Sequence, residues 1–239
     1  MAHSISGFGY LASGIRLLAQ PGIKRFVVVP VLINILVFSG MIYLGAQQFT
    51  HFMDWILPPD VWYSVIRPIL WPLFAIAAVL IGFFTFSMVA NMIASPFNSL
   101  LAQRVEEHLT GEKLNAKGQA LSMMASIRNE IRKITYALSR AIPILILFLI
   151  PVVNVAAPVI WFLFGAWMMT IQYADFTMAN HHLAFDEQRR RLKTRKLASF
   201  GFGAAVTLMT LVPILNFFAM PSAVAGASKM WVEVLRHSE

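Results

Sequence analysis

The chain has 239 residues, which suffice for one large domain or two small ones. Hydrophobic residues make up 58% of it and charged residues only 13%, and this balance excludes an ordinary soluble protein, because a fold of this size cannot hide so much apolar surface from water. The formal net charge of +8 does not indicate nucleic-acid binding, because basic residues also gather on the cytoplasmic side of a membrane protein, and the absence of cysteine excludes a disulfide framework and a thiolate metal site.

The N-terminal segment, residues 1–20, is predicted to form an amphipathic helix along the membrane surface. Its apolar side chains recur at helical spacing and share one face: Ile5, Phe8, Leu11, Ile15 and Leu18. A helix with one apolar and one polar face binds at the boundary between headgroups and acyl chains. We therefore expect this helix to lie outside the hydrocarbon core.

Four stretches of the chain carry no charged residue: 26–53, 68–103, 141–174 and 197–228. Each exceeds the ~20 residues that cross a hydrocarbon core of about 30 Å. The first stretch predicts one transmembrane helix over residues 21–46. The second predicts a long transmembrane helix over residues 68–110 that continues into the cytoplasm, because its second half turns polar. Gly111, the usual kind of helix terminator, should end it.

The third and fourth stretches are too long for one span and too short for two. Each contains the same interruption, a Pro-x-x-Asn sequence, at Pro151 to Asn154 and at Pro213 to Asn216. The residues from 141 to the first of these prolines give only about 16 Å of helix, too little to cross. Two re-entrant hairpins, over 141–174 and 197–235, are therefore predicted. Irregular backbone at membrane depth needs protein or water around it, so the hairpins indicate a packed oligomer or an aqueous pathway.

The lysines and arginines, 19 in all, are unevenly distributed. All but Arg67 fall in the N-terminal region, in the loops after the second and third stretches, or at the C-terminal end. Positively charged loops stay in the cytoplasm, so both termini are predicted to be cytoplasmic and the protein to be multi-pass.

A second amphipathic helix is predicted over residues 119–140. Its apolar face holds Ala120, Met124, Ile127, Ile131, Ile134 and Leu138. This face is expected to pack on the cytoplasmic part of the long helix. The predicted fold class is thus an all-α integral membrane protein, with two transmembrane helices, two re-entrant hairpins and amphipathic cytoplasmic helices in a single membrane domain over 1–239.

The segment just before the first span has the features of an anion site. Pro21 is favoured at the first position of a helix, and the free backbone N–H groups that follow favour an anion. Gly22 lets an anion approach the backbone closely, and Lys24 and Arg25 add two positive charges. These features suit a tetrahedral dianion. The alternative is a plain positive-inside anchor of the kind that flanks most spans.

Several other polar residues stand in apolar surroundings or at the predicted mouth of a pathway. The candidates for lining a pore are Asn34, Asn91, Arg104, Glu107, Asn154 and Asn216. Buried amides can equally bond helices together, and Glu106 and Glu107 can equally form a solvated helix face. Both readings of these residues stay open at the level of the sequence.

Enzyme chemistry finds little support. His181 and His182 are adjacent, so their side chains diverge on a helix, and with Asp175 and Asp186 they match no known metal-ligand spacing. The sequence holds no nucleophile elbow, phosphate-binding glycine loop, zinc-protease motif or paired catalytic carboxylates. We therefore expect neither an enzyme nor a bound metal or cofactor.

Long blocks of the sequence resemble the CysZ sulfate permease family. They are QPGIKRFVVVPVLIN, NMIASPFNSLLA, PVIWFLFGAWMMTIQYADF, the pattern NHH..F.E..R.L.TRK and VPILNFFAMPSAVAGASKMW, and the resemblance runs from about Gly7 to Trp231. It implies sulfate uptake across the bacterial inner membrane for cysteine biosynthesis. It also implies two transmembrane helices, two half-penetrating hairpins, a homo-oligomer in membrane lipid and no ATPase subunit.

The family's sulfate-binding motif, glycine–hydrophobic–basic–basic, falls on Gly22, Ile23, Lys24 and Arg25. Lys24 stands where the family more often has arginine, and a lysine is a point charge without the planar fork of a guanidinium. Three hypotheses for function follow. A channel-like or secondary permease is favoured over a non-transporting scaffold or sensor that regulates another sulfate transporter. The third is a lipid-modifying enzyme that would use His181, His182 or Asp175.

Overall fold

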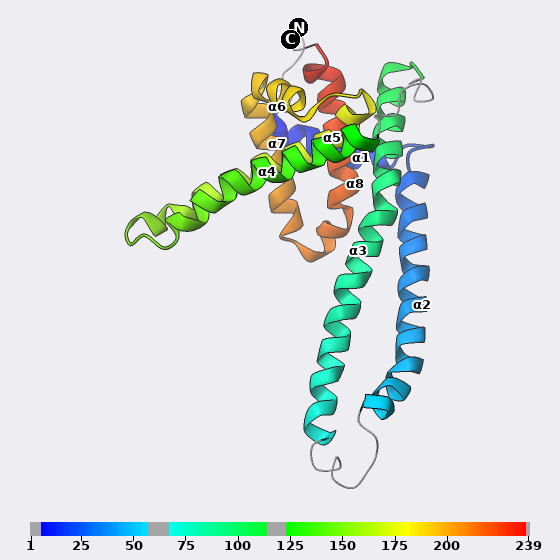
Figure 1. Cartoon of the computed structure of the whole chain (residues 1–239). Helices are drawn as coiled ribbons and strands as arrows, with labels where there is room; N and C mark the ends of the chain where they lie inside the picture. The colour runs from blue at the N-terminus through cyan, green and yellow to red at the C-terminus, as the bar shows by residue number, and fades with distance from the viewer. Residues whose placement is uncertain (1–5, 57–66, 114–122, 238–239) are drawn as a thin grey trace. The chain divides into compact units, whose positions relative to one another are not determined.

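The computed structural model describes residues 6–56, 67–113 and 123–237, and every regular element in these ranges is a helix (Figure 1). Within these ranges, three helical stretches are long and apolar enough to cross a membrane: Arg25–Gly45, Pro68–Thr110 and Ala157–Asn180. The first two coincide with the predicted spans, and the third overlaps the region predicted as the first hairpin, 141–174, but continues to Asn180. An all-helical protein with helices of membrane-spanning length is therefore confirmed.

The described residues form two compact units, of which the smaller is Val28–Phe97. It contains most of α2 (Arg25–Ile56) and the first part of α3 (Arg67–Thr110). Most of its described large apolar side chains are exposed, and Leu36, for example, is 75% exposed. Within the unit the rings of Phe38 and Phe86 lie 4.4 Å apart. An apolar groove of about 610 Å³ has Gly45 and Gly82 in its lining.

The larger unit, Met1–Val27 together with Asn98–Glu239, has a true core. Its central elements are α1 (Gly7–Leu18), α5 (Ala157–Asn180), α7 (Lys196–Thr210), α8 (Pro213–Met230) and the π-helix Trp231–Leu235. The backbones approach closely: a Cβ on Gly203 would lie 1.7 Å from the carbonyl oxygen of Ala166, and one on Gly14 would lie 2.1 Å from that of Ser222. Glycine is therefore required where α7 meets α5 and where α1 meets α8.

Both proline-containing interruptions break a helix, but differently. The first follows α4 (Met123–Leu147) and includes a short 3₁₀-helix, Val153–Val155, before α5 begins. Val152 there has a φ of 71°, an uncommon angle for a β-branched residue. At the second interruption Pro213 opens α8 almost directly after α7 ends, and the two helices run back alongside each other (Figure 1). In the described residues, each interruption thus separates two consecutive helices, α4 from α5 and α7 from α8. The re-entrant hairpin arrangement stays a prediction.

The packing of α4 differs from the expectation. Ile127, Ile131, Ile134 and Leu138 on its apolar face are all exposed. The helix instead uses polar groups to contact α5 and α6 (Phe185–Thr194). Lys133 Nζ lies 2.8 Å from Asp175 Oδ2, and Arg132 Nη1 lies 3.0 Å from Asp186 Oδ2. Trp167 Nε1 donates to the hydroxyl oxygen of Tyr136 over 3.0 Å. The amphipathic pattern identified the two faces of α4 correctly, but the polar face, rather than the apolar one, contacts α5 and α6.

Candidate functional site

A tight turn connects α1 to α2 and carries the predicted anion motif. The carbonyl of Gln20 accepts hydrogen bonds from the N–H groups of Ile23, at 3.2 Å, and Lys24, at 3.3 Å. Gly22 adopts a φ of +87°, which only glycine adopts without strain. Helix α2 therefore begins at Arg25 rather than at Pro21. Two of the N–H groups expected to face an anion, those of Ile23 and Lys24, are already bonded.

This turn forms one wall of a pocket of about 320 Å³, and the C-terminal end of α3 forms another. The lining residues are Pro21, Gly22, Ile23, Arg25, Arg104, Glu107, His108, Gly111, Glu112 and Lys113. A Cβ on Gly22 or on Gly111 would meet no atom within 4 Å, so both glycines leave open space. Two segments that are distant in sequence, residues 21–25 and 104–113, thus line one polar cavity.

Two arginines meet at the ring of Phe26 beside this pocket. The guanidinium carbon of Arg25 lies 4.9 Å from the ring centroid and that of Arg104 lies 6.0 Å from it. Arg104 Nη1 also pairs with Glu107 Oε2 at 2.8 Å. Within the described ranges, no carboxylate forms an ion pair with Arg25. The Arg25 charge is therefore available to a ligand, whereas that of Arg104 is shared with Glu107.

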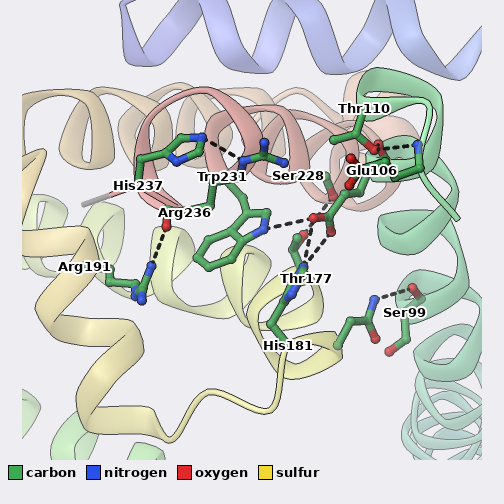
Figure 2. A network of polar contacts seen from close by, with 12 residues as sticks. Ser99, Glu106, Thr110, Thr177, His181, Arg191, Ser228, Trp231, Arg236 and His237 are labelled. Carbon is green, nitrogen blue, oxygen red and sulfur yellow. Dashed lines mark hydrogen bonds and ion pairs between the residues drawn. The ribbon is translucent and has the colours of Figure 1, made fainter. Parts of the chain in front are cut away.

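The last turns of α3 have two faces with different partners. Arg104, Glu107, His108 and Gly111 recur at i, i+3, i+4 and i+7, and all line the anion pocket. Glu106 lies on another face and is only 3% exposed. Figure 2 shows it directed toward His181 and Trp231.

The Glu106 carboxylate has two hydrogen-bond donors. His181 Nε2 lies 2.9 Å from each of its oxygens, and Trp231 Nε1 donates to Oε1 over 3.2 Å. A second pocket, of about 590 Å³, adjoins this cluster. Its lining comprises Glu106, Thr110, Glu112, Lys113, His181, Leu183, Arg191, Trp231, Arg236 and His237. Arg191 is held in place there, because its Nη1 donates to the backbone carbonyl of Arg236 at 2.9 Å.

Of the predicted site residues, Gly22, Ile23, Arg25, Arg104 and Glu107 meet at the smaller pocket. The remaining ones do not line it. Lys24 is exposed, and so are Asn154 in the 3₁₀-helix and Asn216 in the first turn of α8. Asn34 is half-buried, and its amide oxygen has no partner among the described residues. The side chain of Asn91 lies outside the described part of the structure.

The histidine and aspartate side chains weighed as an enzyme or metal site have separate partners. His181 bonds Glu106, whereas Asp175 Oδ1 accepts from Gln188 Nε2 over 2.8 Å. Asp186 pairs with Arg132. In the part of the chain that the structure describes, no three His, Asp or Glu side chains are grouped as metal ligands.

Sequence reasoning did not identify His108, Glu112 and Lys113 as lining residues. One signal was present: His108 lies one helical turn beyond Arg104, so both must share a face. The other was the glycine at 111, whose N–H donates to the carbonyl of Glu107 over 2.9 Å and whose φ is +73°. The predicted end of the long helix is therefore confirmed, and it turns the chain along the pocket wall.

Comparisons with known proteins agree on one family. A family model described as sulfate transporter CysZ/etoposide-induced protein 2.4 matches residues 10–221. The protein named sulfate transporter CysZ in Pseudomonas fluorescens is 43% identical over 234 residues, 95% of this chain and 93% of the relative. The proteins of the same name in Pseudomonas aeruginosa and Vibrio cholerae are 40% and 42% identical, over 96% of this chain and 95% and 94% of their own.

Proposed function

Because the chain belongs to the sulfate transporter CysZ/etoposide-induced protein 2.4 family, we propose that it carries sulfate into the bacterial cell across the inner membrane. Relatives that share 40–43% identity with nearly the whole chain are named as sulfate transporters, which supports a transporter over an enzyme. Helices of membrane-spanning length support an integral membrane protein. Supply of sulfate for cysteine biosynthesis is part of the same proposal.

One observation carries the proposal for the site: Gly22 and Arg25 share a cavity with Arg104 and Lys113. Sulfate is a dianion with four acceptor oxygens, and it suits a cavity that offers two guanidinium groups and an ammonium group, with open space beside Gly22. A cavity of about 320 Å³ also has room for some of the anion's water. We therefore place initial sulfate binding there, with Lys24 as an exposed charge nearby.

Glu107 gives this site a means of release. Its carboxylate pairs with Arg104, so an arriving sulfate must compete with it for the guanidinium group. A transport site must bind well enough to load and weakly enough to unload. We propose that the Arg104–Glu107 pair separates when sulfate binds and closes again when it leaves.

The onward path must replace the hydration shell of the dianion, because a bare dianion cannot cross hydrocarbon. Asn34 is a candidate, since its buried amide oxygen has no described partner. Asn91, Asn154 and Asn216 remain candidates from the sequence. We propose that the two hairpins enter the membrane from the cytoplasmic side, with both termini cytoplasmic, and that several copies pack together without an ATPase subunit.

The proposal is tested by sulfate flux into liposomes that contain the purified full-length protein. Protein-dependent uptake of labelled sulfate without an imposed proton gradient supports a channel-like permease, and uptake only with the gradient indicates coupled transport. Folded protein that binds sulfate but carries no flux under either condition would instead support the scaffold or sensor hypothesis.

The site is tested by Arg25→Ala, with Arg128→Ala as the matched control. Both variants remove one exposed arginine, but Arg128 lies on α4 and does not line the pocket. A charge-assisted hydrogen bond contributes about 1.5–3 kcal/mol, so we expect Arg25→Ala to weaken sulfate binding at least about tenfold. Arg128→Ala should leave the affinity unchanged. Equal affinities for the two variants would rule out the proposed site.

A further inference from the structure

The final turns of α3 must be held at one rotation for the anion pocket to exist. Arg104 and Glu107 line the pocket, and each residue is turned by about 100° from the next along a helix. Glu106 precedes Glu107 directly, so its side chain leaves the helix on a different face. Whatever fixes the direction of Glu106 therefore also fixes the directions of Arg104 and Glu107.

Glu106 is fixed by donors from two other elements. His181 is the C-cap residue of α5, and Trp231 begins the π-helix that follows α8. Both donate to the same buried carboxylate (Figure 2). A buried carboxylate without partners is strongly unfavourable, and the bonds that satisfy it are directional. The cluster thus joins α3, α5 and the end of α8 with one set orientation.

The other contacts on this side of α3 are less restrictive. Leu101, Ala102 and Val105 are fully buried against the core, but apolar contacts allow small rotations. Asn180 Nδ2 donates to the backbone carbonyl of Ser99 over 3.0 Å, a bond that does not depend on the α3 side chains. The Glu106 cluster, by contrast, combines charge, burial and direction.

We propose that Glu106 is a positioning residue for the anion pocket: with His181 and Trp231, it holds the end of α3 so that Arg104 and Glu107 face the ligand. Glu106 itself does not line that pocket and does not contact sulfate. The inference rests on the proposed function of the pocket. A binding site whose supporting contacts are loose loses much of its affinity even when its own residues are intact.

The test measures sulfate affinity in purified full-length protein that carries Glu106→Ala, Glu106→Gln, Arg104→Ala, or Glu106→Ala with Arg104→Ala. Loss of the charged hydrogen bonds should weaken sulfate binding about tenfold in Glu106→Ala. Glu106→Gln keeps a carbonyl acceptor for His181 or Trp231 and should recover most of the affinity. If Glu106 acts through Arg104, adding Glu106→Ala to Arg104→Ala should weaken binding by less than about twofold further.

A control separates positioning from general stability. Thr177 and Ser228 form a buried hydroxyl pair at 2.8 Å that joins α5 to α8 without involving α3. Thr177→Ala should lower the melting temperature but leave sulfate affinity unchanged. The inference is overturned if Glu106→Ala binds sulfate normally. It is also overturned if the fold-loss of sulfate affinity in the double variant equals the product of the losses in Glu106→Ala and Arg104→Ala. If Arg104→Ala and Arg25→Ala both bind sulfate normally, the pocket itself is wrong, and the positioning role is wrong with it.

Discussion

The two compact units handle apolar side chains in opposite ways. In Val28–Phe97, large apolar residues such as Leu36 and Val79 are mostly exposed. In the other unit, Phe202 and Val224 are fully buried together with polar groups such as Thr170 and Ser228. The first unit therefore depends on an apolar surrounding medium, whereas the second builds its own interior. The candidate site lies in the unit that has its own interior.

Glycines show the same contrast. A Cβ on Gly40, Gly45 or Gly82 in the smaller unit would meet nothing within 4 Å, whereas one on Gly203 would overlap the backbone of α5. Glycine thus has free space around it in the smaller unit, whereas in the larger unit it permits close contact between helix backbones. Substitutions of the same kind should have opposite consequences.

The largest effect is expected from Gly203→Ala. The added methyl group would lie 1.7 Å from the Ala166 carbonyl oxygen and 2.5 Å from Thr170 Oγ1, so α5 and α7 must separate. We expect a loss of about 3 kcal/mol or more in folding stability. Gly82→Ala is the matched control and should gain stability through helix propensity, by up to about 1 kcal/mol. The measurement is the melting temperature of each variant in detergent. Equal shifts in melting temperature for Gly203→Ala and Gly82→Ala would contradict the contrast between the two units.

A smaller effect is expected from a charge placed on the exposed surface of α2. Leu36→Lys puts an ammonium group at a position that we propose faces hydrocarbon, which costs about 3 kcal/mol for insertion near a helix centre. Leu197, at the start of α7, is 92% exposed and adjoins Lys196. Leu197→Lys should change membrane insertion by less than about 0.5 kcal/mol. Equal insertion of both variants would show that exposure in the smaller unit does not report contact with lipid.

The smallest effect concerns alkaline pH and the larger unit. Burial, together with the nearby Glu233 carboxylate, raises the pKa of Tyr10 from 10.0 to about 12. Burial alone would lower the pKa of Lys133, but the Asp175 and Glu130 carboxylates outweigh it and raise that pKa above 10.5. In both cases the unfolded chain loses its proton first as the pH rises. The contribution of Tyr10 and Lys133 to the free energy of unfolding is therefore complete below pH 10 and declines as the pH rises above it.

Thermal unfolding between pH 9 and pH 12 measures this decline. Tyr10→Phe should flatten it, because phenylalanine has no proton to lose. A decline of unchanged steepness in Tyr10→Phe would assign the alkaline sensitivity to other groups.

Much of the fold could be predicted from the sequence, because its strongest signals are long uncharged stretches and helix breakers. The predicted break at Pro213 and the end of the long helix before Gly111 were both correct. The packing of α4 could not be predicted. Periodicity identifies an apolar face but not its partner, and here the polar groups of Lys133 and Arg132 make the protein contacts.

The candidate site could be predicted only in part. Gly22 and Arg25 stood out because glycine and basic residues precede a span. Glu106 and Glu107 are chemically identical neighbours, and only the rotation of α3 decides which one is buried. The true start of α2 at Arg25 depends on hydrogen bonds to the Gln20 carbonyl, and no residue pattern marked these.

The close contact of α1 with α8 has a consequence for biosynthesis. Gly14 meets the backbone of Ser222, and Ser13 bonds Lys229 across a separation of 216 residues. At the ~5–20 residues per second of translation, that separation corresponds to roughly 10 to 40 seconds. The first helix to leave the ribosome therefore waits for its main partner until synthesis is nearly complete. A nascent chain that stops before α8 keeps the Gly14 side of α1 uncovered and open to chaperones or proteases.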